Sequence, residues 1–446
     1  MTRFSNRIFV SILTLSIAHL VGCTATSEPQ ASIETPSETS VRQATTDLVE
    51  ANDSRLLSPD APDAQVQQQI EQYLDTLAAN GFDPTQQGVW IQTEETLLAN
   101  RRGTTPFPAA SVTKIATTLA ALRVFEIDRR FVTEFKTTGE IRDGVLNGDL
   151  VVAGNFDPMF VWEDAIEIGN LLNEQGIDRV KGNLVIAGTF YMNFEEEVAY
   201  SGELLKQGLN ANLWTGEAQA QYQTLSPGTP RPQVEIAGDV RVVPEASANA
   251  QLLIRHESLP VPELLKLMNR YSNNSIAHTF ANAMGGADVV VREVLEATGV
   301  PPMEIQLTNG SGLGRENQIS PRTAVAMYLA IERELKPHNL TVSDVVAIAG
   351  VDDGILSPRS LPTLAVIKSG SLNAVSTISG GLPTQQRGVV WFAVMNGGAD
   401  TEILRLEQER LLNRLESQWG KVETLPPELA VDRSRVQLQP RNEVMR

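Results

Sequence analysis

The chain has a single cysteine and only four histidines in 446 residues. One cysteine cannot form an internal disulfide, so packing and hydrogen bonds alone must hold the fold. The few histidines and the cysteine make no metal-ligand pattern, and no glycine-rich nucleotide-binding motif is present. The sequence therefore predicts a protein that uses no metal or other cofactor.

The chain also lacks an apolar run long enough for a comfortable membrane span. The longest candidate, residues 8–21, follows two arginines and has the layout of a secretory signal. It ends in Leu20-Val-Gly-Cys23, which resembles a bacterial lipobox, in which the cysteine becomes the lipidated first residue. The alternative is an ordinary signal peptide with an incidental thiol at Cys23. We expect residues 1–23 to be a lipoprotein signal, so that the exported protein is anchored to a bacterial membrane and faces the periplasm or cell wall.

Basic residues are in the minority, and the formal net charge is −18. Such an acidic chain repels phosphate backbones, which argues against nucleic acid as a partner. It is equally a poor ligand for anionic lipids. Attachment to the membrane should therefore depend on acyl chains at Cys23 rather than on surface charge.

Composition divides the rest of the chain into a tether and a folded body. Residues 24–63 are rich in Ser, Thr, Pro, Glu and Ala and cannot bury enough apolar surface to offset chain entropy. The remaining length suffices for two domains. We expect a main domain in two segments, 64–130 and 258–422, an inserted accessory domain at 131–257, and a polar C-terminal tail at 423–446.

Apolar periodicity predicts a mixed α+β body. The insert is rich in β-branched residues and in glycine turns such as Asp143-Gly and Asn147-Gly, which predicts a β-rich domain. Helical spacing marks residues 64–80, the segment after Ser111, 276–284 and 401–419. The predicted strands are 88–92, 363–367, 374–379 and 388–395.

Three short motifs bring a nucleophile, amides and cations into one chain. They are Ser111-Val-Thr-Lys114, Ser272-Asn-Asn274 and Lys368-Ser-Gly370. A serine hydroxyl is a poor nucleophile until a base takes its proton, and a lysine three residues later on a helix lies beside it. That lysine must be neutral, and burial near a second cation such as Lys368 would lower its pKa. The helix N-terminus would favour negative charge that develops at Ser111.

The order of these motifs resembles that of the class C penicillin-binding proteins, the D-alanyl-D-alanine carboxypeptidase/endopeptidase family. The flanks strengthen the resemblance: Phe107-Pro-Ala-Ala precedes Ser111, and Asn309-Gly-Ser-Gly-Leu-Gly-Arg-Glu-Asn317 precedes the third motif. The segment 147–158 also resembles the accessory-domain signature of that family. The resemblance implies a penicillin-binding/β-lactamase-like transpeptidase fold whose main domain is catalytic. It further implies a serine-type D-Ala-D-Ala carboxypeptidase, possibly also an endopeptidase, that acts on peptidoglycan stem peptides and is inhibited by β-lactams.

The same resemblance implies a role for each motif residue. Ser111 would be acylated and Lys114 would be its base, with Ser272 relaying a proton to the leaving amine and Asn274 holding the substrate backbone. Lys368 and Ser369 would face the terminal carboxylate, Gly370 would allow close approach of the peptide, and the backbone N–H groups of Ser111 and Ser371 would form the oxyanion hole. The chain departs from the usual pattern at Asn273, where aspartate is usual, and at Ser369, where threonine is commoner.

The sequence leaves other readings open. A β-lactamase would need an additional base to activate water, and no glutamate can be assigned to that task. A catalytically silent peptidoglycan-binding lipoprotein would have no use for a base beside a hydroxyl. A lone histidine such as His278 is more often structural than catalytic, and Arg315, Glu316 and Asn317 fit a solvated loop as well as a site. The oligomeric state is undetermined.

Overall fold

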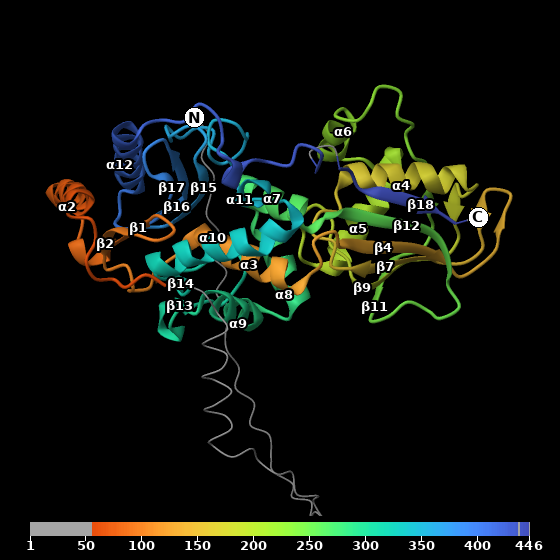
Figure 1. Ribbon diagram of the computed structural model, residues 1–446. Coiled ribbons are helices and arrows are strands. Elements are labelled where there is room, and N and C mark those ends of the chain that lie inside the picture. Colours follow the sequence, from red (N-terminus) through yellow and green to blue (C-terminus); the bar gives the residue numbers. More distant parts are fainter. Residues whose placement is uncertain (1–55, 436–437, 446) are drawn as a thin grey trace, which may run out of the picture. The chain divides into compact units, whose positions relative to one another are not determined.

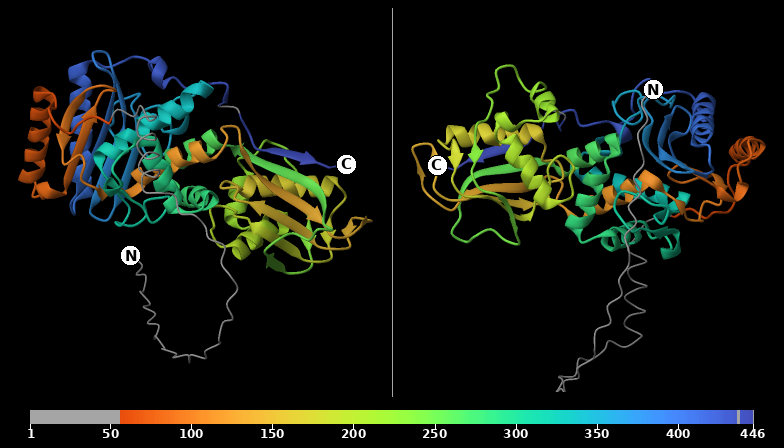
Figure 2. Two further views of the ribbon diagram at one scale, coloured as in Figure 1. Left: turned by 60° about the horizontal axis from the view of Figure 1, so that its bottom comes forward. Right: turned by 180° about the vertical axis from the view of Figure 1, so that it is seen from behind.

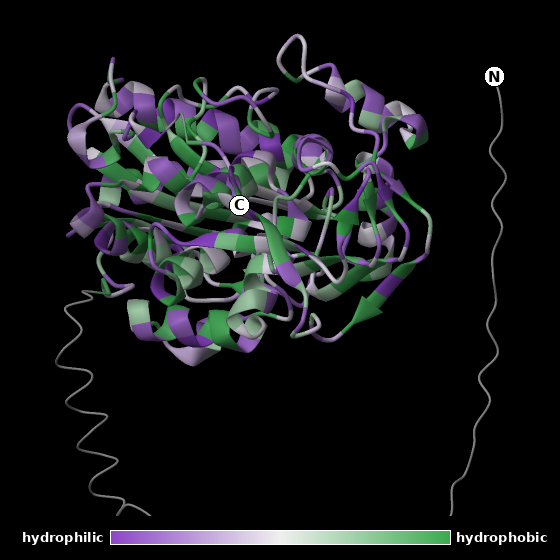
Figure 3. Ribbon diagram, turned by 90° about the vertical axis from the view of Figure 1, so that its right-hand side faces the viewer, coloured by the Kyte–Doolittle hydropathy of each residue, from purple (hydrophilic) through white to green (hydrophobic). Residues whose placement is uncertain are grey.

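The computed structural model describes residues 56–435 and 438–445. The signal segment, Cys23 and most of the tether lie outside this range. Two large sheets, one of five and one of six strands, organise the described chain. No helix in this range is long and apolar enough to cross a bilayer. Hydrophobic and hydrophilic residues are mixed along its helices and strands (Figure 3).

The five-stranded sheet is antiparallel and joins the two ends of the main domain. Its strand order is β15-β16-β17-β1-β2, so a strand from the first segment pairs directly with one from the second. The strand predicted at 363–367 ends before the third motif. In the structure, β15 continues through this motif, and Lys368, Ser369 and Gly370 all pair in register with residues of β16. The strands are β1 (Gln87–Gln92), β2 (Leu97–Arg101), β15 (Val366–Leu372), β16 (Val375–Thr384) and β17 (Gly388–Gly397).

Helices cover both faces of this sheet (Figure 1). The terminal helices α2 (Ala64–Ala79) and α12 (Thr401–Trp419) pack on one face, around a cluster that includes Ile70, Val89 and Leu412. Helix α2 begins where the Asp63 carboxylate accepts the N–H groups of Gln65 and Val66, an N-cap that satisfies otherwise unpaired donors. Both helices agree with the predicted periodicity.

The opposite face carries the helices that hold the first two motifs. Helix α3 (Thr113–Val124) and helix α10 (Pro321–Leu335) lie against the sheet through residues such as Ile115, Tyr328 and Trp391. A small sheet of order β13-β14-β3 pairs Phe107 with Ile319 and so brings the two predicted flanks together. The other elements here are α7 (Val261–Tyr271), α8 (Asn274–Met284), α9 (Ala287–Thr298), α11 (Val342–Val345), β3 (Phe107–Pro108), β13 (Ile305–Gln306) and β14 (Gln318–Ile319).

The insert is built on the six-stranded sheet, of order β11-β9-β7-β4-β12-β18, with a smaller sheet beside it, of order β10-β8-β6-β5. Parallel strands β7, β9 and β11 require crossover connections, and helices α4, α5 and α6 occur in them. The β-rich composition did not predict these helices, although Ala165, Ile168 and Leu172 have helical spacing and are buried. The helices of the insert are α4 (Trp162–Glu174), α5 (Val198–Gly208) and α6 (Gly216–Tyr222). Its strands are β4 (Arg130–Thr137), β5 (Ile141–Arg142), β6 (Val145–Leu146), β7 (Leu150–Asn155), β8 (Arg179–Val180), β9 (Leu184–Thr189), β10 (Glu235–Ile236), β11 (Val240–Val243) and β12 (Gln251–Pro260).

The C-terminal segment ends in a strand of the insert's sheet, β18 (Arg441–Val444), which lies along β12 (Figure 2). Asn442 Oδ1 lies 2.9 Å from Nδ1 of the buried His256 on β12. The polar composition of this segment gave no indication of a strand. We propose that the end of the chain belongs structurally with the insert.

Candidate active site

Ser111 lies in a tight turn immediately before helix α3. The turn is a 3₁₀ segment, Ala110–Val112, and Ala110 has a positive φ of 46°. Two bonds to Ala109 hold the turn: its N–H donates to Asn317 O at 2.9 Å, and its carbonyl accepts from Thr377 Oγ1 at 2.9 Å. The nucleophile candidate is therefore fixed by β16 and by the Asn309–Asn317 flank, two segments far away in sequence.

The amine of Lys114 is fully buried and lies among three oxygen atoms. Its Nζ is 3.0 Å from Ser111 Oγ, 2.7 Å from Asn274 Oδ1 and 2.9 Å from the carbonyl oxygen of Ser311. Burial lowers the pKa of Lys114 to about 7, because removing an ammonium from water favours its neutral form. The structure thus brings together the first motif and the amide of the second.

The second motif joins two helices. Ser272 ends α7 in the left-handed region, at φ 53°, and Asn273 Oδ1 caps α8 by accepting the N–H of Ile276. Asn273, and not Ser272, is therefore the N-cap of α8. The hydroxyl of Ser272 instead accepts a hydrogen bond from Lys368 Nζ at 2.9 Å, which links the second motif to the third.

Lys368 is as fully buried as Lys114. Besides Ser272, its Nζ donates to the carbonyl of Ser369 at 2.6 Å. Burial lowers the pKa of Lys368 well below its usual value, and the charge of Lys114 lowers it further. The shift disfavours the positive charge expected on Lys368, because neither of its hydrogen-bond partners carries a negative charge to offset the loss of water.

The outer edge of β15 presents backbone groups beside Ser111. Ile367 donates its N–H to Ala347, away from β16. Because strand N–H groups alternate, those of Ser369 and Ser371 point the same way. A Cβ at Gly370 would lie 2.6 Å from the backbone nitrogen of Ser111, so only glycine permits this close approach. The Ser371 hydroxyl accepts from Arg405 at 2.8 Å.

The Asn309–Asn317 flank supplies part of the site that the motifs alone do not include. Asn309 Oδ1 accepts the N–H groups of Ser311 and Gly312 and so shapes the loop whose carbonyl contacts Lys114. The side chain of Asn317 is fully buried and bonded to this loop, whereas Arg315 donates to the carbonyl of Asn373 at 3.1 Å. The sequence of this flank indicated the family but not the contact between Ser311 and Lys114.

A second array of polar side chains lies behind Ser311. His278 Nε2 is 2.7 Å from Ser311 Oγ, and His278 Nδ1 is 2.9 Å from a carboxylate oxygen of Glu196. A carboxylate, an imidazole and a hydroxyl follow one another here, as they do in the catalytic triads that activate a serine. Ser311, however, is completely buried and cannot contact a substrate. The array therefore orients the loop that holds Lys114. Glu196 comes from the insert, and no motif in the sequence indicated it.

Comparison with known proteins decides the family. The family model described as the D-Ala-D-Ala carboxypeptidase 3 (S13) family matches residues 66–212 and 219–418. The chain belongs to this family. It is similar to the D-alanyl-D-alanine carboxypeptidase DacB of Haemophilus influenzae, at 22% identity over 70% of this chain and 85% of the relative. A D-alanyl-D-alanine carboxypeptidase of Actinomadura sp. is 28% identical over 46% of this chain and 37% of its own length.

Solved structures agree with this assignment of the fold. Penicillin binding protein 4 (dacB) of Haemophilus influenzae, in complex with a β-lactam, has a TM-score of 0.60 and 19% identity, covering 77% of this chain and 99% of that one. A predatory peptidoglycan endopeptidase of Bdellovibrio bacteriovorus has a TM-score of 0.61 and 19% identity over 76% and 94%. The predicted α+β penicillin-binding fold and the predicted family are confirmed, and the S13 chain is a serine peptidase of the D-Ala-D-Ala carboxypeptidase type.

We predict that His278→Leu slows turnover of a D-Ala-D-Ala peptide about tenfold, or about 1.4 kcal/mol in activation free energy. Without the imidazole, Ser311 loses its outer partner, and the carbonyl that holds Lys114 becomes less restrained. Steady-state hydrolysis measures the effect, with His338→Leu as the control because His338 is exposed on the surface. Equal rates for the two variants would contradict a positioning role for His278.

Proposed function

We propose that this S13 peptidase cleaves D-Ala-D-Ala stem peptides of peptidoglycan through an acyl-enzyme at Ser111, and that β-lactams inhibit it by acylating the same oxygen. The observation that supports this most strongly is the surroundings of the Lys114 amine. A neutral amine has two N–H groups and one lone pair. The Asn274 and Ser311 oxygens are both acceptors, at 2.7 and 2.9 Å, so they take the two N–H groups and leave the lone pair for the Ser111 hydroxyl.

Acylation then follows from general base catalysis. Lys114 takes the proton of Ser111 as Oγ bonds to the scissile carbonyl carbon. The resulting oxyanion accepts the N–H groups of Ser111 and Ser371, an assignment supported by the direction of the β15 edge. When the C–N bond breaks, the proton passes to the leaving D-Ala amine through Ser272, whose hydroxyl is oriented by Lys368. Water then attacks the acyl carbon and gives a proton to Lys114, the C–O bond to Ser111 breaks as Oγ takes that proton back, and the shortened peptide leaves with a new carboxyl group.

We assign binding of the substrate peptide to the open edge of β15. An extended peptide can add to such an edge through its backbone, and the glycine at 370 removes the side chain that would block it. We assign recognition of the terminal carboxylate to Lys368 and Ser369. A carboxylate beside Lys368 would raise the pKa of the amine again, because an opposite charge favours the protonated form. Charge on Lys368 would then accompany substrate binding.

Membership in the S13 family favours a peptidase over a wall-binding module, and endopeptidase action on cross-links is compatible with the same acyl-enzyme. A cell-wall substrate places the enzyme outside the cytoplasm.

We further propose that it is exported as a lipoprotein anchored at Cys23, supported by the Leu20-Val-Gly-Cys23 sequence. Residue 23 lies outside the described part of the chain.

Ser111→Ala should abolish covalent labelling by a fluorescent penicillin and release of D-Ala, because no hydroxyl remains to be acylated. The fold should persist, since the change removes one oxygen. Labelling on a gel and mass analysis of digested muropeptides measure the two activities. An intact Ser111→Ala protein that still labels would refute the acyl-enzyme assignment, and rapid hydrolysis of the β-lactam by the wild type would favour a β-lactamase.

The two lysines should respond differently to arginine. Because Lys114 must be neutral to act and its pKa is about 7, we expect the acylation rate to rise with pH through about 7. Lys114→Arg should be nearly inactive at every pH, since a guanidinium stays protonated. Lys368→Arg should keep part of its rate, because arginine can still bind a carboxylate. Acylation by a chromogenic β-lactam across pH tests this, and greater damage in Lys368→Arg would reverse the two roles.

Cys23→Ala should yield a protein without attached fatty acid, soluble or unprocessed, because the residue that receives the lipid is missing. Incorporation of radiolabelled palmitate, followed by cell fractionation, measures this outcome. Palmitate in the variant at the wild-type level would exclude Cys23 as the anchor.

A further inference from the structure

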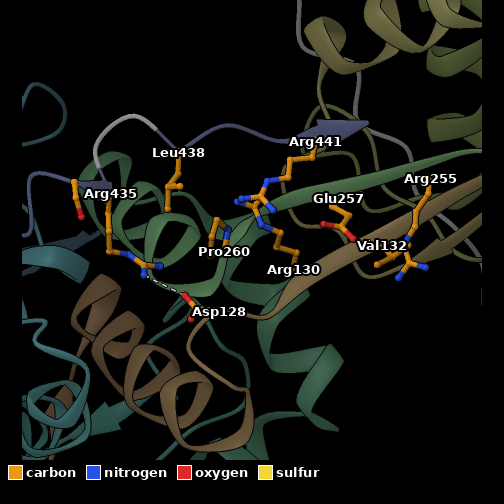
Figure 4. Close-up of a pocket in the computed structure, with 10 residues that line it drawn as sticks. Asp128, Arg130, Val132, Arg255, Glu257, Pro260, Arg435, Leu438 and Arg441 are labelled. Carbon is orange, nitrogen blue, oxygen red and sulfur yellow. Dashed lines mark hydrogen bonds and ion pairs between the residues drawn. The ribbon is translucent and has the colours of Figure 1, made fainter. Parts of the chain in front are cut away.

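A cavity of about 540 Å³ lies at the junction of β4, β12 and the C-terminal segment (Figure 4). None of the catalytic candidates lines it. Arginines from three strands do: Arg130 at the start of β4, Arg255 on β12 and Arg441 on β18. In a chain with a net charge of −18, such a gathering of cations is unexpected from composition.

Two of these arginines have no anionic partner within hydrogen-bonding distance. Among the described residues, Arg130 donates only to the neutral carbonyls of Ser258, at 2.6 Å, and Gln439, at 3.0 Å. Arg441 forms no ion pair or side-chain hydrogen bond with any described residue. Figure 4 shows the guanidinium groups of Arg130 and Arg441 directed toward each other. Burial lowers the pKa of Arg130 and the charge of Arg441 lowers it further, because the two cations repel each other, while the more weakly acting Glu257 and Glu263 carboxylates raise it in part.

The remaining charges around the cavity are already engaged. Arg435 pairs with Glu263 through two bonds, at 2.6 and 3.0 Å, and with Asp128 at 3.1 Å. Glu257 lies 3.5 Å from Arg255 Nε, a buried nitrogen that has no hydrogen-bond acceptor. Four arginines and two carboxylates line the cavity, which therefore carries an excess of positive charge.

We propose that this cavity is a binding site for a compact oxyanion of the phosphate or carboxylate class, held between Arg130 and Arg441. Planar guanidinium groups bind such anions through paired N–H donors. An anion there would neutralise the repulsion between the two arginines. Because Arg130 and Arg441 belong to β4 and β18, a bound anion would also tie the C-terminal strand to the point where the chain enters the insert.

Calorimetric titration of the full chain with inorganic phosphate at low ionic strength tests the site. Arg441→Gln should weaken phosphate binding about tenfold, as expected when one of two charge-assisted contacts is lost. Arg241→Gln on β11 is the matched control, because it removes the same charge from an exposed position of the same sheet and should leave binding unchanged. Absence of phosphate binding in the wild type, or equal binding by Arg441→Gln, would overturn the proposal.

A variant that should bind phosphate more tightly provides a second test, because misfolding would not raise the affinity. Glu257→Gln removes a nearby negative charge that acts on Arg130 and would repel a bound anion, so phosphate should bind several times more tightly. Weaker binding in this variant would contradict the proposed site.

A competition experiment distinguishes two sources of the anion. Displacement of phosphate by a soluble muropeptide identifies carboxylates of the cell wall as the ligand, and failure to displace it identifies free phosphate. Thermal unfolding without ligand checks each variant.

Discussion

The burial of one amine, that of Lys114, constrains the rest of the active site. An ammonium removed from water is unstable unless it is paired, so the site favours the neutral amine and satisfies its hydrogen bonds with uncharged oxygens. Those oxygens belong to the start of α3, the start of α8 and the loop after Asn309. Three segments must therefore meet at one nitrogen, and the packing of the helices against the central sheet serves to bring them there.

Close backbone approach is the second requirement of this geometry. Gly370 allows β15 to lie against the turn that holds Ser111, and Gly312, at φ 81°, allows its loop to lie against Ala110. A side chain at either glycine would occupy space that backbone atoms already fill. Together with the bond from Thr377 to Ala109, these contacts fix the serine between an open strand edge and a buried amine. A substrate peptide would thus meet preorganised donors rather than induce them.

The insert contacts the main domain at one place, and the C-terminal strand joins the insert at another. Glu196 reaches His278 and, through Ser311, the surroundings of Lys114. At the other place, β18 pairs with β12 and completes the cavity lined by Arg130 and Arg441. Sequence patterns revealed neither contact, since both depend on single polar residues in segments of ordinary composition.

The sequence by itself determined the family, the mixed α+β fold and the three motifs, because these depend on local patterns. The helical spacing of 64–80, the apolar strands and the three-residue interval between Ser111 and Lys114 are of this kind. Only the tertiary structure decided which groups surround the two lysines. Burial of Lys368 among neutral partners, the contact of Ser311 with Lys114 and the role of Asn273 as a cap arise from segments far apart in sequence. A pKa depends on the loss of water and on nearby charges, and neither is determined until the chain has packed.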